Sequence, residues 1–221
     1  MKSFLNTLID VLSEQHENYN IHKRDDNPFT AEFFQKLTPS NATEEEKGSV
    51  NDYTYDSRKI NKDLWSTNGN NHKDIIDKIS SYIDKAPAAP EDFHVYTGIN
   101  GKKNETKGFI HIPAFTSTSS DIHVAAKFVS PAKNRHTEEY RNDINGNNVL
   151  HTIHHILKIH VKKGQKVGAY VAPHSDMPTE KEFLINKGHT ITIGNHVDIK
   201  DAHDPKTIYR IHHATINMHG E

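Results

Sequence analysis

The sequence has 221 residues, a length that fits one domain or at most two small ones. Acidic and basic residues nearly balance, 29 Asp and Glu against 27 Lys and Arg, and the net charge of −2 argues against a protein that binds DNA by charge alone. The absence of cysteine excludes disulfides, thiol nucleophiles and Cys-ligated zinc, and no apolar run approaches the ~20 residues of a membrane span, so we expect a cytoplasmic protein without membrane contact.

Residues 1–90 predict the helical part of a single domain. Apolar side chains recur there at helical spacing, and segments rich in Pro, Asn and Thr interrupt the pattern. We expect helices at 4–12, 29–37, from Glu44 onward, at 56–65 and at 75–83.

Residues 91–221 predict a β-rich core of the same domain. Ile outnumbers Leu 22 to 8, which favours strands over helix bundles. A short helix is expected at 121–129, with Asp121 as its N-cap, and a polar loop at 131–147. Strands are expected at 93–96, 108–112, 149–161, 166–171, 182–185, 190–193 and 208–216. The order of helices and then strands indicates an α+β fold.

Two glutamates that enter a predicted strand, Glu180 and Glu182, are candidates for chemistry. Residues i and i+2 of a strand project to one face, so both carboxylates can point into one cleft. Their environments can separate their pKa values, so that one stabilises a cation while the other deprotonates a nucleophile. The alternative is a solvated edge strand with alternating charges.

Hydroxyl groups gather between a predicted strand and the helix at 121–129. Ser117, Thr118 and Ser119 lie there and could hold a carboxylate in place by hydrogen bonding. The alternative for this segment alone is a Ser/Thr turn that caps the helix.

Histidine is unusually frequent, with 18 residues scattered along the sequence, and the segment 151–160 could suggest a metal site. Neither same-face pair in that run has i, i+2 spacing, and the run contains no Asp or Glu. This pattern favours structural or surface histidines over metal ligands, and a His-rich metal-binding protein remains the third hypothesis.

The ordered set Val95-Tyr96-Thr97-Gly98, Ser117-Thr118-Ser119 and Glu180-Lys181-Glu182 resembles the mono-ADP-ribosyltransferase family. That family's signature is an Arg at the end of the first core strand, then Ser-Thr-Ser, then Glu-x-Glu. The resemblance begins near Tyr53, because residues 53–64, with Asn61 in an Ile-Asn-x-x-Leu pattern, look like the family's NAD-side helix. Among its branches the sequence is most similar to the Alt/Mod enzymes of T-even-type bacteriophages.

The resemblance implies helices packed on two facing antiparallel sheets, with NAD in the cleft between them. It implies that Glu182 stabilises the oxocarbenium ion, that Glu180 activates an arginine acceptor and that Ser117 supports Glu182. Implied NAD contacts are Tyr96, Thr97, Gly98, Thr118, Ser119 and Asn61.

One position departs from the family pattern, because Thr97 stands where the family has its Arg. A threonine cannot supply a charged, forked donor for NAD phosphates. Arg58, on the NAD-side helix, is our first candidate to replace it, and Arg135 and Arg141, in the expected loop, are the others.

The function that the resemblance implies is transfer of ADP-ribose from NAD to arginine of a host protein, without a metal. The branch suggests acceptors in the transcription or translation machinery, with NAD-capped RNA as a further candidate, and we expect a monomer in the host cytoplasm. The alternative, motivated by Thr97, is a catalytically silent or NAD-binding interaction module on the same fold.

Overall fold

The computed structural model describes residues 29–101, 108–129, 136–143 and 145–217. The helix expected at 4–12 and the candidate Arg135 lie outside these residues. The α-helices are α2 (Ala31–Gln35), α3 (Glu44–Tyr55), α4 (Arg58–Thr67), α5 (Lys73–Asp84) and α6 (Ile122–Phe128). No helix in the described ranges has the length and apolar character to cross a bilayer.

Helix α3 begins where the acidic run predicts, and a capping box fixes that start. The Thr43 hydroxyl accepts from the Glu46 amide at 3.2 Å, and the Glu46 carboxylate accepts from the Thr43 amide at 2.7 Å. These two bonds satisfy amides that a helix N-terminus leaves without partners.

Within the described ranges, nine strands form the sheet, in the order β2-β8-β9-β5-β1-β3-β7-β6, with β4 paired to β5. Their bounds are β1 (Phe93–Ile99), β2 (Gly108–Ile112), β3 (Thr116–Ser119), β4 (Thr137–Asn142), β5 (Asn148–Val161), β6 (Gly168–Tyr170), β7 (Glu182–Ile185), β8 (His189–Lys200) and β9 (Thr207–Asn217). All neighbours are antiparallel except β5 and β9, which run parallel.

The sheet consists of two halves that meet at a seam. Strand β1 pairs with β5 along its whole length but with β3 only through the register pair Tyr96 and Ser119. One half runs from β2 to β1 in this order and includes β4, and the other contains β3, β7 and β6. One apolar core nevertheless contains Leu157 and Ile191 from the half with β1 and Phe183 from the half with β3. The expected α+β fold is therefore confirmed, with the refinement that the two facing sheets join in one hydrogen-bonded order because backbone pairing continues across the seam.

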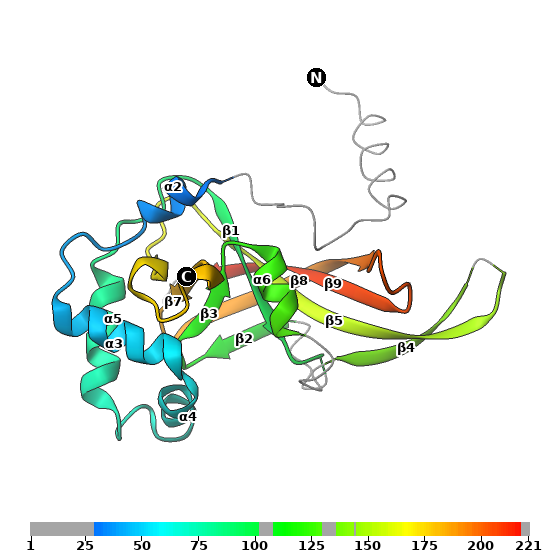
Figure 1. Ribbon diagram of the computed structural model, residues 1–221. Helices are drawn as coiled ribbons and strands as arrows, with labels where there is room; N and C mark the ends of the chain where they lie inside the picture. Colours follow the sequence, from blue (N-terminus) through cyan, green and yellow to red (C-terminus); the bar gives the residue numbers. More distant parts are fainter. Residues whose placement is uncertain (1–28, 102–107, 130–135, 144, 218–221) are drawn as a thin grey trace.

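The helices α3, α4 and α5 gather at one end of the molecule, and the paired strands β4 and β5 extend at the other (Figure 1). Tyr53, Ile60 and Ile79 of these helices share a second core with Phe115 and Leu184 from the strand part. The helical and β-rich parts are thus packed together through common apolar contacts.

The polar loop expected at 131–147 contains strand β4, so that expectation is wrong for 137–142. Charged side chains, rather than alternating apolar ones, connect β4 to the sheet. Arg210 binds Asp198 at 2.8 Å and Glu139 at 2.5 Å, and Arg141 binds Asp198 at 2.6 Å. A pattern of charges therefore concealed a strand held by cross-strand ion pairs.

The histidine-rich strand β5 contributes to a buried histidine pair. Nδ1 of His155 lies 3.0 Å from Nε2 of His212, with the rings stacked at 5.3 Å, and Nε2 of His155 lies 2.7 Å from the Thr137 hydroxyl. Burial lowers the pKa of both histidines to about 4. In the ranges that the structure describes, no three His, Asp or Glu residues gather as metal ligands.

Candidate active site

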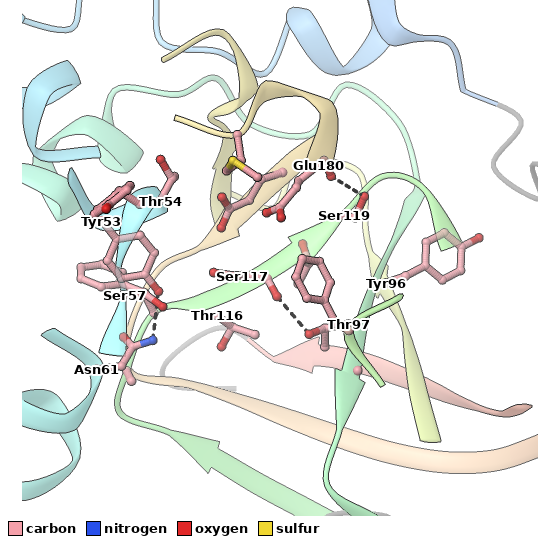
Figure 2. Close-up of a pocket in the computed structure, with 18 of the residues that line it drawn as sticks. Tyr53, Thr54, Ser57, Asn61, Tyr96, Thr97, Thr116, Ser117, Ser119 and Glu180 are labelled. Carbon is pink, nitrogen blue, oxygen red and sulfur yellow. Dashed lines mark hydrogen bonds between the residues drawn. The ribbon is translucent and has the colours of Figure 1, made fainter. Parts of the chain in front are cut away.

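A cavity of about 720 Å³ lies at the seam, between helices α3 and α4 on one side and strands β1, β3 and β7 on the other (Figure 2). Its size falls within the usual range for small-molecule sites. The residues that line it include Tyr53, Thr54, Tyr55, Ser57, Asn61, Trp65, Tyr96, Thr97, Gly98, Phe115, Thr116, Ser117, Thr118, Ser119, Phe128, Asp176, Met177, Glu180 and Glu182.

Glu182, the first residue of β7, is a buried carboxyl in the cavity wall, with 4% of its surface exposed. Burial raises its pKa to about 7, the Ser117 hydroxyl works against this shift, and the negative charge of Glu180 adds to it. Its Oε1 is buried and has no hydrogen-bond partner in the described parts of the chain. A bound molecule could therefore supply the missing donor.

Glu180 reaches the same cavity by a route that the sequence did not indicate. It ends the short 3-10 helix η4 (Pro178–Glu180), and Lys181 adopts a left-handed conformation with φ of 49° before β7 begins. The expectation that both glutamates share a strand is therefore wrong, because the chain turns between them. The turn still leaves both side chains in the cavity wall.

The segment 119–121 holds this turn by several contacts. The Ser119 hydroxyl donates to the Glu180 carbonyl at 2.7 Å, as Figure 2 shows, and the Ser120 amide donates to the Lys181 carbonyl at 3.1 Å. Lys181 Nζ pairs with Oδ2 of Asp121 at 2.8 Å, while Oδ1 of Asp121 caps α6. The helix cap and the glutamate turn are thus joined.

Three of the hydroxyl residues of β3, Ser117, Thr118 and Ser119, differ in their contacts. Thr118 donates to the carbonyl of Phe183 at 2.5 Å, and Ser119 accepts from the Asp121 amide at 3.0 Å, as in a Ser/Thr turn before the helix. The Ser117 hydroxyl lowers the pKa of the Glu182 carboxyl. The Ser/Thr turn is therefore present at Ser119, and support of the Glu182 carboxylate by Ser117 stays a prediction.

Tyr53 is a member of the site whose role sequence reasoning missed. Its hydroxyl accepts a hydrogen bond from Asn61 Nδ2 at 3.0 Å. Burial raises the pKa of Tyr53, and the negative charge of Glu182 adds to this effect. The resemblance began at this residue, but no local pattern pointed to the contact of its ring with Phe115, 62 positions away.

The end of β1 borders the cavity at Tyr96, Thr97 and Gly98. The Tyr96 ring packs into the core beneath α6, and the Thr97 hydroxyl donates to the Ser117 carbonyl at 3.0 Å (Figure 2). A Cβ at Gly98 would lie 2.2 Å from Val129 Cγ1, so close approach of the α6 terminus requires a glycine there. The Thr97 hydroxyl thus links β1 to β3, and Gly98 allows the end of α6 to pack against β1.

The two candidate arginines that the structure describes, Arg58 and Arg141, do not line the cavity. Arg58 is exposed over 88% of its side chain and pairs with Asp56 at 2.8 Å, while Arg141 belongs to the ion-pair network of β4. Among the described residues, no Lys, Arg or His lines the cavity, whereas Asp176, Glu180 and Glu182 do. The described wall therefore carries an excess of negative charge, which favours a cationic occupant near the glutamates.

The chain matches the family model of the ADP-ribosyltransferase exoenzymes over residues 16–215. Its fold is similar to Plx2a, an ADP-ribosyltransferase toxin from Paenibacillus larvae, with 21% identity, a TM-score of 0.58, and 85% of this chain and 92% of that chain covered. It is also similar to C3stau2 from S. aureus, solved with NAD, with 17% identity, a TM-score of 0.58, and coverages of 84% and 93%. ADP-ribosyltransferase Vis from Vibrio splendidus, solved with agmatine, shares 20% identity, with a TM-score of 0.50 and coverages of 89% and 90%. No curated protein matches the chain.

Proposed function

The chain belongs to the ADP-ribosyltransferase exoenzyme family, whose reaction transfers ADP-ribose from NAD, and from this premise we propose that its acceptor is an arginine side chain. One observation carries the proposal: Glu180 and Glu182 line one cavity whose described wall has no positively charged side chain. A guanidinium ion fits such a wall because carboxylates bind it through paired, charge-assisted hydrogen bonds. Vis was solved with agmatine, which carries a guanidinium group, and this agrees with the proposal.

In the proposed reaction, Glu182 acts on the NAD ribose. The bond between nicotinamide and ribose breaks with its electron pair moving to the nicotinamide nitrogen, and the ribose becomes an oxocarbenium cation. The ionised Glu182 lies in a buried wall, where a negative charge stabilises such a cation more than it would in water. Its unpartnered Oε1 can accept a hydrogen bond from a ribose hydroxyl.

Glu180 then serves the acceptor. A guanidine nitrogen attacks the cationic ribose carbon, a new C–N bond forms, and the proton released from that nitrogen moves to the Glu180 carboxylate. The contacts of residues 119–121 to the turn orient this side chain beside Glu182. No step in this sequence requires a metal ion.

For NAD itself we propose contacts from residues that line the cavity: Asn61, Tyr96, Thr97, Gly98, Thr118 and Ser119. The hydroxyls of Thr118 and Ser119 already donate to backbone carbonyls, so these two residues shape the wall. Arg58 remains our proposal for a phosphate contact, and it would have to leave Asp56 to reach the cavity. Arg141 would have to leave Glu139 and Asp198.

Finer assignments are proposals that depend on the motif resemblance. They are the Alt/Mod-like relationship, a monomer acting in a host cytoplasm, and a host acceptor from the transcription or translation machinery, with NAD-capped RNA as the second class. Incubation of the protein with labelled NAD and a bacterial lysate, followed by mapping of the modified residues, tests them together.

The central test uses purified protein, NAD and agmatine, with nicotinamide release and ADP-ribosyl-agmatine measured separately. Glu180→Gln should lose most transfer to agmatine and keep most NAD hydrolysis, because cleavage of the glycosidic bond depends mainly on Glu182. Equal loss of both activities would contradict the division of roles. ADP-ribosylation of proteins at residues other than arginine, without transfer to agmatine, would contradict the arginine proposal.

A silent module is the second candidate, and Thr97 together with the absence of basic side chains from the described cavity wall favours it. An active enzyme releases nicotinamide from NAD at a rate above the uncatalysed one. A silent module binds NAD in calorimetry and releases none.

A further inference from the structure

Three large apolar side chains stand exposed around the mouth of the cavity. Tyr55, at the end of α3, is 77% exposed, Trp65 of α4 is 60% exposed, and Met177, before η4, is 46% exposed. We call these three residues the apolar rim. Such residues are rarely left in water as a group, and Trp, Tyr and Met are enriched where proteins dock.

Hydrogen bonds hold the rim in place. The Asp176 amide donates to the Thr54 hydroxyl at 2.9 Å, which fixes the loop that carries Met177 to the helix that carries Tyr55. Asn61 of α4 donates to Tyr53 of α3 at 3.0 Å. The rim is therefore a preorganised surface, which reduces the ordering cost of binding.

The charge inside the rim identifies the kind of group that enters. Asp176 and Glu180 line the cavity, and both lie close in sequence to Met177 of the rim. Among the described residues, no basic side chain lines the cavity. The part of the wall formed by Asp176 and Glu180 would repel a phosphate group on an acceptor, whereas it would attract a cationic side chain. An occupant that fits both features has a positive side chain surrounded by apolar surface.

We propose that the apolar rim docks the acceptor and selects an arginine flanked by apolar residues. Asp176 and Glu180 receive the guanidinium, while Tyr55, Trp65 and Met177 cover the apolar neighbours of the target arginine. This proposal rests on the proposed transfer to arginine and adds the surroundings of that arginine to it.

The test compares three acceptors with NAD held constant. The first is a peptide with arginine between Leu and Phe residues, the second is a peptide of equal length with arginine between Gly and Ser residues, and the third is agmatine. We expect the wild-type protein to prefer the apolar peptide over the Gly/Ser peptide by about tenfold in kcat/KM, which corresponds to ~1.4 kcal/mol.

Trp65→Ala and Met177→Ala should each reduce that preference several-fold. The matched control is Tyr140→Ala, since Tyr140 is also an aromatic residue, is 68% exposed and lies on β4 rather than at the cavity. The control should keep the wild-type preference. Because the measurement is a ratio between two peptides, a general loss of activity in a variant does not change it.

Equal use of the two peptides by the wild-type protein would overturn the proposal. So would a Trp65→Ala variant whose KM rises more for NAD than for the apolar peptide, since the rim would then bind the nucleotide. Transfer to agmatine distinguishes failure of the rim proposal from failure of the arginine proposal. If agmatine is modified, equal use of the two peptides contradicts the rim proposal alone. If agmatine is not modified, the arginine proposal and the rim proposal both fall.

Discussion

Glu182 is subject to two opposite demands. Burial favours its neutral form and raises its pKa to about 7, whereas stabilisation of a cation requires the carboxylate. The Ser117 hydroxyl favours the carboxylate, and the charge of Glu180 opposes it. The protonation of this one side chain should therefore control activity near neutral pH.

The first prediction concerns the pH profile of NAD cleavage. In the free enzyme, kcat/KM for nicotinamide release should increase about tenfold per pH unit below pH 7 and level off above it, because only ionised Glu182 is active. Ser117→Ala removes a hydroxyl that lowers the pKa, so its midpoint should move to higher pH. A flat profile between pH 5.5 and 8 would contradict this role for Glu182.

The second prediction concerns Glu182→Gln, which keeps the shape and removes the charge. Nicotinamide release should fall by ~100-fold or more, the scale expected for an electrostatic contact to a transition state. Near-normal release would show that another group performs this task. Thr116→Ser, a small change in the same cavity wall, serves as the control.

The same variant should be more stable than the wild type at alkaline pH. A carboxyl whose pKa rises from 4.5 to about 7 contributes stability that is present below pH 4.5 and is lost as the pH rises through 7. Above pH 7 the buried charge costs the wild type about 3 kcal/mol. Urea unfolding at pH 5 and pH 8 should show the advantage of Gln growing with pH, and an equal difference at both pH values would contradict it.

At this scale the sequence was informative where the motif is local. The hydroxyl and glutamate motifs contain Ser117, Glu180 and Glu182, and the structure places all three in the cavity wall. The sequence was uninformative where the position of a residue depends on contacts with segments distant in the chain, as for Tyr53 in the cavity wall. Nor could the sequence show that the Arg58 side chain points to Asp56. A side chain that points to Asp56 and one that points to the cavity are both compatible with a helix that begins at Arg58.

Among the secondary-structure elements, the turn between Glu180 and Glu182 has the largest effect on the geometry of the site. Lys181 adopts a positive φ that a residue other than glycine rarely adopts, and its ion pair with Asp121 joins the turn to the start of α6. Unusual backbone conformations of this kind persist when the surroundings hold them. The orientation of Glu180 therefore depends on a contact outside the cavity.

We predict that Asp121→Asn reduces transfer to agmatine by about tenfold while reducing NAD hydrolysis less, because small displacements of a positioned group are costly. Asparagine keeps an oxygen to cap α6 and loses the charge that holds Lys181. Lys181→Arg should retain the wild-type ratio of transfer to hydrolysis. Lys73→Ala, which breaks an exposed ion pair on α5, is the control, and an unchanged ratio in Asp121→Asn would contradict the prediction.

The elements were predictable where apolar residues set the period. Helix α5 (Lys73–Asp84) covers the expected 75–83, and strand β7 begins at Glu182, where the sequence predicts it. Strand β4 was missed because Glu139 and Arg141 point to partners on other strands, and β8 was expected to end at 193 because its continuation is exposed and polar. Apolar periodicity does not report such strands, because backbone pairing with a neighbouring strand and cross-strand ion pairs hold them in place of a buried apolar face.

Across the whole molecule, histidines make stability depend on pH. His155 and His212 are stacked within the sheet, with Arg210, Glu139 and Asp198 as the charged groups around them. Burial is the main cause of their lowered pKa, and the charge of Arg210 adds to it. Both rings are therefore neutral in the folded protein at neutral pH.

The resulting prediction is a loss of thermal stability between pH 7 and pH 5. A histidine with its pKa lowered from 6.5 to about 4 contributes stability that is present above pH 6.5 and is lost as the pH falls below it, since the unfolded chain then binds more protons. Replacing His155 and His212 together by Gln should reduce the decrease in Tm over this range. An equal decrease in wild type and double variant would show that other groups are responsible.

The seam between the sheet halves also has a mechanical consequence. Backbone pairing crosses from β1 to β3 only at Tyr96 and Ser119, so the resistance of the sheet to bending is lowest along that line. The cavity lies over the same line and is lined from both halves. A molecule bound there contacts both halves of the sheet, and it stiffens the protein most along the line where the backbone alone resists bending least.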